Sequence, residues 1–131
     1  SHVFNKWNTW DRVFDPFADV ARLETHWREN LSQRTDADTL RAKWLSWMLT
    51  TTIRDLRNRV TRALYWFGRR NAVALFEMTV QAADINDPYV FERLMAASYG
   101  VAMALTCIPD QKEFREKTLP NMARQVVAVM F

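Results

Sequence analysis

The stretch that decides the fold of this chain is residues 86–103, which read NDPYVFERLMAASYGVAM. Asn86 or Asp87 can accept hydrogen bonds from the free N–H groups of a first helical turn, and Pro88 has no N–H to lose there. At 100° per residue, two stripes of the helix that follows are apolar. The first stripe comprises Val90, Leu94, Ala97, Val101 and Leu105, and the second comprises Phe91, Met95, Tyr99 and Ala102. A helix that is apolar on two sides is buried on two sides, so we expect the rest of the chain to pack around it.

The composition is that of one globular and mostly helical domain. Of the 131 residues, 49% are hydrophobic and 25% are charged, a balance that supports a core and argues against disorder. There are only two glycines and four prolines, and no Asn-Gly or Asp-Gly hairpin signal, which disfavours an all-β fold. We therefore expect residues 1–131 to form a single domain.

Charge, cysteine content and the two ends of the chain limit its setting. A net charge of +3 permits nucleic-acid binding without implying it. Cys107 is the only cysteine and lies in an apolar run, so we expect a packed thiol in a reduced, cytoplasmic protein. Ser1-His2 is typical of the scar of a cleaved tag, and the chain ends inside the apolar run 126–131. We expect the chain to be a fragment of a longer protein.

Prolines, polar loops and apolar periodicity divide the chain into about seven helices. They are expected before Asp15, over residues 17–31, from Asp36 or Asp38 to about residue 50, over 53–69, 71–83 and 86–107, and after Pro109, with Pro120 starting or kinking the last one. Thr50, Thr51 and Thr52 end the third of these helices and can cap the fourth. In the third helix, an i, i+4, i+7, i+8 spacing predicts an apolar side formed by Leu40, Trp44, Trp47 and Met48.

Two of the predicted helices share a pattern. Leu56, Arg59, Val60 and Ala63 recur 34 positions later as Val90, Arg93, Leu94 and Ala97, with one helix between the two copies. Such an arrangement is typical of stacked helical hairpins. The Asp87-Pro88 start and the internal arginine favour a HEAT-like unit over a tetratricopeptide unit. We predict an all-α, right-handed, α-solenoid-like stack of helical hairpins.

The helix over residues 53–69 places its cations opposite its apolar stripe. The resulting basic face contains Arg54, Arg59, Arg62, Trp66, Arg69 and Arg70. Arginines around an aromatic ring can contact phosphates and stack on bases, so this face is the predicted partner-binding site. The alternative is a solvated outer face in which Trp66 packs on a neighbouring helix beneath arginine side chains. Arg59 and Arg93 are expected to bond loop carbonyls or acids such as Asp55 or Asp87.

The motifs of common catalytic, metal and nucleotide sites are absent from the sequence. Two glycines cannot build a Gly-rich phosphate loop. No His-x-x-x-His or Cys-x-x-Cys pair occurs, and His26 stands alone if His2 belongs to a tag. Asp84, Asn86 and Asp87 lack the other ligands of a calcium loop, which favours a capping role. We predict no catalytic, metal or cofactor site, and a protein that is not an enzyme.

Three runs of sequence form a recognisable combination: residues 47–64 (WMLTTTIRDLRNRVTRAL), 87–94 (DPYVFERL) and 97–102 (ASYGVA). Together with the tail 119–127 (LPNMARQVV), they resemble the C-terminal helical-repeat region of bacterial antiviral STAND NTPases of the AVAST type. Val60 stands where that family has alanine, and the tail lacks its tyrosine and glycine. The resemblance implies a sensor segment that follows an effector and an NTPase, binds a phage protein such as a terminase or portal, and triggers oligomerisation.

Three functional hypotheses follow. The first is a non-catalytic protein-recognition module of a larger defence NTPase that binds a phage protein. The second is a nucleic-acid-binding module that uses the basic face, and its affinity would fall steeply with salt. The third is a structural helical spacer.

Overall fold

The computed structural model describes residues 15–85, 87–107, 120–121 and 124. Within them the protein is all-α, with five packed helices, one 3-10 helix and no strand. The elements are α2 (Pro16–Glu29), α3 (Asp36–Trp47), η1 (Met48–Thr50), α4 (Arg54–Gly68), α5 (Ala72–Ala82) and α6 (Pro88–Thr106). The helix predicted before Asp15, and nearly all of those predicted beyond Pro109, lie outside the described residues.

Three helices begin at polar side-chain caps, and one of these caps, Asp87, is predicted from the sequence. The Asp15 carboxylate accepts from the N–H of Ala18, the third residue of α2, and Pro16 occupies the first helical position. Asn71 caps α5 through its side-chain oxygen. Asp87 caps α6, because its carboxylate accepts from the N–H of Tyr89 at 3.0 Å. These starts are local in origin, since each needs only a polar side chain and a neighbour two or three residues away.

Two predicted caps are wrong. The cap of α3 is Thr35, whose hydroxyl accepts from the N–H of Asp38 at 3.1 Å while the Asp38 carboxylate accepts from the N–H of Thr35 at 3.0 Å. This is a capping box, and it places Asp38 inside the helix. Helix α4 has no side-chain cap, because its N-cap position is Ile53; the Thr51 hydroxyl, two residues earlier, accepts from the N–H of Ile53 itself.

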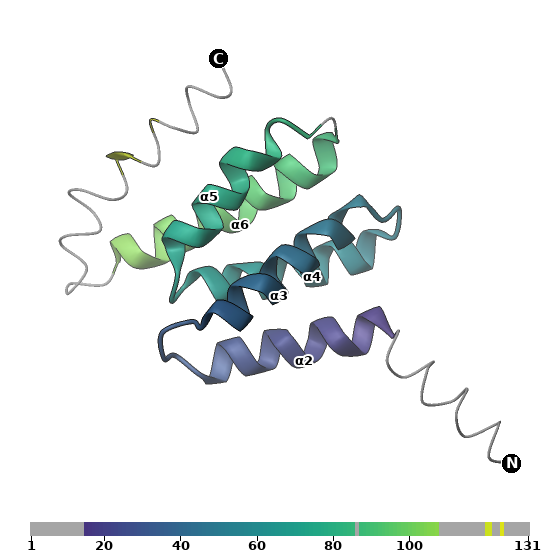
Figure 1. Ribbon diagram of the computed structural model, residues 1–131, viewed down its shortest axis with the longest axis horizontal. Coiled ribbons are helices and arrows are strands. Elements are labelled where there is room, and N and C mark those ends of the chain that lie inside the picture. Colours follow the sequence, from purple (N-terminus) through teal and green to yellow (C-terminus); the bar gives the residue numbers. More distant parts are fainter. Residues whose placement is uncertain (1–14, 86, 108–119, 122–123, 125–131) are drawn as a thin grey trace, which may run out of the picture.

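Helices α2 and α4 lie side by side and run in the same direction. Glu24 of α2 pairs with Arg62 of α4 at 3.3 Å. Further along both helices, the ring centroids of Trp27 and Phe67 are 5.2 Å apart. Because contacts advance together along the two helices, the helices are parallel. Figure 1 shows α2 below the α3–α4 pair, with the α5–α6 pair above it.

Helices α4 and α6, which carry the 34-residue pattern, are also parallel neighbours. Arg93 Nη1 donates to Asn58 Oδ1 at 2.5 Å, and Gly100 lies against the ring of Tyr65. In both contacts the partners are 35 residues apart (93 − 58 and 100 − 65). The prediction that Arg93 bonds an acid or a loop carbonyl is therefore wrong. Helices α3 and α5 complete the arrangement by packing on α4 and α6.

The central helix is α4, not α6. Helix α6 buries its first predicted stripe completely, from Val90 to Leu105, but its second stripe is only partly buried, and Tyr99 is 67% exposed. Cys107, predicted to be packed, is also exposed. Helix α4 packs against α2, α3, α5 and α6. Its buried residues are Leu56, Arg57, Val60, Ala63, Leu64, Phe67 and Gly68.

The predicted apolar side of α3 is not its buried side. The helix turns Ala42 and Leu45 into the core, followed by Leu49 of η1. Leu40, Trp44 and Trp47 are exposed, whereas Met48 is partly buried against the core. In α5, Phe76 is buried whereas Val73 is exposed. Both helices carry apolar residues on more than one side, and tertiary contacts select which side is covered.

A buried arginine joins the ends of α2 and α4. Arg34, in the loop after α2, is 8% exposed and donates four hydrogen bonds to backbone carbonyls. The acceptors are Trp27 O (2.8 Å), Asn30 O (2.6 Å), Trp66 O (2.8 Å) and Phe67 O (3.3 Å). The last carbonyls of a helix have no partner within it and carry its negative dipole end, so a guanidinium can satisfy both helices at once. Burial lowers the pKa of Arg34, which nevertheless remains charged.

Candidate functional site

The basic face predicted from the sequence divides into two groups in the structure. Arg59 and Arg62 face α2: the Arg59 guanidinium lies 5.6 Å from the centre of the Phe17 ring, and Arg62 pairs with Glu24 at 3.3 Å. The expected bond from Arg59 to a loop carbonyl or an acid is replaced by this ring contact. A loop carbonyl is bonded by Arg57 instead, which donates to Thr51 O at 2.8 Å. These cations therefore take part in packing between helices.

The second group lies around Trp66, at the end of α4. Arg69 lies 5.6 Å from the Trp66 ring centre and 5.9 Å from that of Tyr65, and its Nη1 donates to the Tyr65 hydroxyl at 3.1 Å. Trp66 itself is partly buried against the core. Arg54 and Arg70, the remaining two residues, are exposed and belong to opposite ends of α4, roughly 24 Å apart along the helix at 1.5 Å per residue. The six residues therefore do not form one continuous cluster.

A different surface stands out on α3. Leu40, Trp44 and Trp47 follow an i, i+4, i+7 spacing along one side of the helix and are 66%, 50% and 68% exposed. We call these three residues the Trp ridge. Single exposed apolar side chains are ordinary, but an aligned set on one helix is typical of an interaction surface. Tryptophan is also enriched among the residues that dominate binding energy.

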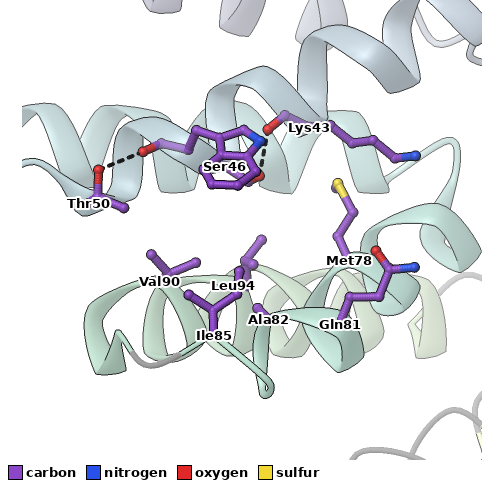
Figure 2. Close-up of a pocket in the computed structure, with 10 residues that line it drawn as sticks. Lys43, Ser46, Thr50, Met78, Gln81, Ala82, Ile85, Val90 and Leu94 are labelled. Carbon is purple, nitrogen blue, oxygen red and sulfur yellow. Dashed lines mark hydrogen bonds between the residues drawn. The ribbon is translucent and has the colours of Figure 1, made fainter.

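An apolar groove lies beside the Trp ridge, between α3 and the α5–α6 pair. Its volume is about 200 Å³, and Figure 2 shows its two walls. The first wall, from α3 and η1, consists of Lys43, Ser46, Trp47 and Thr50. The second, from α5, the turn after it and α6, consists of Met78, Gln81, Ala82, Ile85, Val90 and Leu94. Trp47 thus belongs both to the ridge and to this α3–α5 groove.

The hydroxyl groups in the α3–α5 groove are already engaged. Ser46 Oγ donates to Lys43 O at 2.6 Å, and Thr50 Oγ1 donates to Trp47 O at 2.8 Å (Figure 2). Since both bonds stay within the same helical segment, neither hydroxyl proton is available to a ligand. Apolar side chains form the opposite wall, and Lys43 and Gln81 lie together at one end in Figure 2. The groove is therefore suited to apolar groups, with polar contacts at its end.

On the other side of the Trp ridge lies a polar hollow between α2 and α3, with a volume of about 540 Å³. This α2–α3 hollow is lined by Asp19, Arg22, Leu23, His26, Arg41 and Trp44. Arg22 pairs with Asp19, and Arg41 pairs with Asp38 at 3.6 Å. Both arginine side chains remain more than half exposed. Trp44 lines this hollow and is also part of the ridge.

A buried network holds α3 in place behind the hollow. The indole N–H of Trp27 donates to Asp38 Oδ1 at 3.1 Å, and Thr35 donates to Asp38 Oδ2 from both its N–H and its hydroxyl. Burial alone would raise the pKa of Asp38, but the hydrogen bonds from Thr35 and Trp27 outweigh it and leave this pKa below its ordinary value. The carboxylate thus stays ionised and keeps α3 attached to α2.

The sequence pattern identifies the ridge residues as an apolar side of α3 but does not show that this side is exposed. Leu40, Trp44 and Trp47 lie on one side of α3, and Ala42 and Leu45 lie on another. A helix that packs on one side can bury only one of these sets. The α2–α3 hollow had no signal, because its two arginines become neighbours only through the tertiary fold.

The described residues contain no group of three or more His, Cys, Asp or Glu side chains placed to hold a metal ion. Among the same residues, no helix has the length and apolar character needed to cross a bilayer. Compared with protein-family models, curated proteins and solved structures, the chain matches none of them.

Proposed function

We propose that this chain is a non-catalytic protein-recognition module whose binding surface is the Trp ridge with the α3–α5 groove. The observation that supports this proposal is the exposure of Leu40, Trp44 and Trp47, each at least half accessible on one side of one helix. Burying the exposed half to two thirds of each side chain contributes about 1–2 kcal/mol, a corresponding share of the value for complete burial. A partner that covers them recovers this free energy on binding.

The groove and ridge together suit a helical segment of a partner. A groove of about 200 Å³ accommodates a few apolar side chains and is too small for a whole domain. An amphipathic helix can place one row of apolar side chains into such a groove while its flanks contact the ridge. Because the walls come from three separate helices, the shape of the groove depends on the folded arrangement.

The resemblance to antiviral STAND NTPases supports a more specific proposal. In that setting the chain is a cytoplasmic sensor segment of a larger protein, and the partner is a phage protein such as a terminase or portal. The parallel α2, α4 and α6, with α3 and α5 packed on them, are compatible with a solenoid of helical hairpins. Sensing requires a binding surface and no chemistry, in agreement with the absence of catalytic motifs from the sequence.

Nucleic-acid binding through the predicted basic face receives less support. Arg59, Arg62 and Arg69 are engaged with neighbouring side chains, and Trp66 is partly buried. Stacking on a base requires a ring face that is free. A labelled oligonucleotide tests this alternative directly, since binding through phosphates weakens steeply as salt rises.

The test uses purified phage portal and terminase proteins, with biolayer interferometry on the immobilised chain. Trp47→Ser should weaken binding by at least about tenfold, the loss typical of an interface anchor. Tyr99→Ser on α6 is the matched control, since Tyr99 is 67% exposed and Trp47 is 68% exposed. Both variants should keep the urea midpoint of the parent. Binding that survives Trp47→Ser unchanged refutes the proposed surface, and failure of both phage proteins to bind refutes the sensor assignment.

A further inference from the structure

The charged residues around the Trp ridge indicate the chemistry of a partner that would bind it. Beyond the first turn of α3, the exposed charged side chains are Arg41 and Lys43, both positive. The two carboxylates of α3, Asp36 and Asp38, both lie in its first turn, and Asp38 is buried and bonded to the fold. Arg41 lines the α2–α3 hollow, whereas Lys43 lines the groove on the other side. Cations therefore flank the ridge on both sides.

The α2–α3 hollow adds a second exposed arginine from α2. The Arg22 side chain is 73% exposed, and the Asp19 carboxylate that it pairs with is only 19% exposed. A guanidinium has five N–H donors, and pairing with one carboxylate does not use all of them. An exposed ion pair contributes little to stability, so an incoming carboxylate can share the guanidinium at little cost. The hollow can thus accept acidic groups at Arg22 and Arg41.

The dimensions of the ridge match two turns of a helix. Leu40 and Trp47 are seven positions apart, which corresponds to roughly 10.5 Å along the helix axis. A partner helix with apolar residues at i, i+3 or i+4, and i+7 covers the same length. On such a helix, residues beside the apolar row point to either flank, where Arg41 and Lys43 lie.

We propose that the ridge, the groove and the hollow together bind an acidic amphipathic helix of a partner protein. Its apolar row enters the α3–α5 groove along Trp47, and its flanking Asp or Glu side chains face Arg22 and Arg41 across Trp44. This inference rests on the proposed protein-recognition function and adds the chemistry of the partner. The apolar groove, whose hydroxyls Ser46 and Thr50 are already engaged, favours a protein over a nucleic acid.

The experiment is a selection from a yeast-displayed library of amphipathic helices of about five turns. Apolar residues vary at the row positions, and the flanking positions vary among Glu, Gln and Lys. Selection on the parent chain should enrich Glu at the flanks. Individual peptides are then measured by fluorescence anisotropy at about 50 mM and about 500 mM salt, and the preference for Glu over Gln should shrink at the higher concentration.

Two variants separate the inference from the function on which it rests. In Arg22→Glu/Arg41→Glu the preference should reverse, with Lys-flanked peptides gaining at least about tenfold over Glu-flanked ones. Arg28→Glu, a charge reversal at an exposed position on α2 outside the hollow, is the control and should keep the parent preference. Trp44→Ser/Trp47→Ser should abolish the binding of all peptides.

The outcomes are distinguishable. Enriched helices whose flanks are neutral or basic overturn the acidic partner and leave the proposed function standing. No enrichment over the Trp44→Ser/Trp47→Ser variant overturns the proposed function itself. Tight binding of a labelled single-stranded oligonucleotide that is lost in Arg22→Glu/Arg41→Glu assigns the hollow to nucleic acid instead and also overturns the inference.

Discussion

The replacement of Arg34 by methionine tests the joint between α2 and α4. The variant keeps much of the aliphatic stem but removes all four hydrogen bonds to backbone carbonyls. Two of these bonds, to Trp27 O and Phe67 O, are buried, and the other two are partly buried. Each buried bond to a charged donor contributes about 1.5–3 kcal/mol, so the buried pair accounts for about 3–6 kcal/mol.

Two effects make the expected loss of stability smaller than this sum. Water can reach the partly buried carbonyls of Asn30 and Trp66 once the guanidinium is gone, so their loss adds little. Removing Arg34 also removes the cost of burying a charge, the same effect that lowers its pKa. We therefore expect Arg34→Met to lower the free energy of unfolding by about 2–4 kcal/mol. Arg34→Lys keeps the charge but not the planar set of donors, so most of the loss should remain.

The assay is urea unfolding followed by far-UV circular dichroism. Arg28→Met is the control, because Arg28 lies nearby in the last turn of α2, is exposed, and should change stability by less than about 0.5 kcal/mol. A loss below about 1 kcal/mol for Arg34→Met would show that the four bonds are replaced by solvent. Full stability of Arg34→Lys would show that charge alone is sufficient.

Three further predictions concern the core. Gly68→Ala should lower the free energy of unfolding by about 1–3 kcal/mol, because its Cβ would lie 2.5 Å from a leucine methyl group of α5. Gly100→Ala is the control: its nearest contact would be 3.1 Å, so it should change this free energy by less than about 1 kcal/mol. Equal losses for the two variants in urea unfolding would contradict this packing. Because the pKa of Asp38 is lowered by folding, its carboxylate contributes stability above about pH 4 that is lost as the pH falls through the folded-state pKa. Asp38→Asn should therefore flatten the decline of Tm below about pH 4, and an unchanged acid decline would exclude this role. Thr79→Val should lower the free energy of unfolding by about 1–2 kcal/mol, because the buried Ser98 hydroxyl loses its partner at 2.8 Å. A double-mutant cycle with Ser98→Ala that gives no coupling energy would rule out the bond.

The parts of the fold that were predictable from sequence are those with local causes. The Asp87 cap and the stripe from Val90 to Leu105 need only neighbours within α6, and both are confirmed. The 34-residue spacing between Leu56 and Val90 predicts a helical repeat; the structure shows that α4 and α6 are parallel neighbours, and the repeat itself stays a prediction. Which helix lies at the centre could not be predicted, because this depends on how many other helices each one contacts. Apolar content alone pointed to α6 rather than α4.

The surface around α3 shows the same limit more sharply. The pattern of Leu40, Trp44 and Trp47 identifies an apolar side but does not say whether the protein covers it. Only the competing set of Ala42 and Leu45, seen in three dimensions, settles that. Charge patterning similarly located arginines on α4 without their partners, since Glu24 and the aromatic rings come from other parts of the sequence or of the helix.

The central position of α4 predicts how fast the amide hydrogens of the different helices exchange. Each of α2, α3, α5 and α6 can separate from α4 while the remaining three still cover it. Helix α4 itself loses its cover only when several neighbours have left, so its amide hydrogens should be the slowest in the described helices to exchange with deuterium. Helix α3 buries one side only and exposes its ridge, so its amide hydrogens should exchange faster than those of α4.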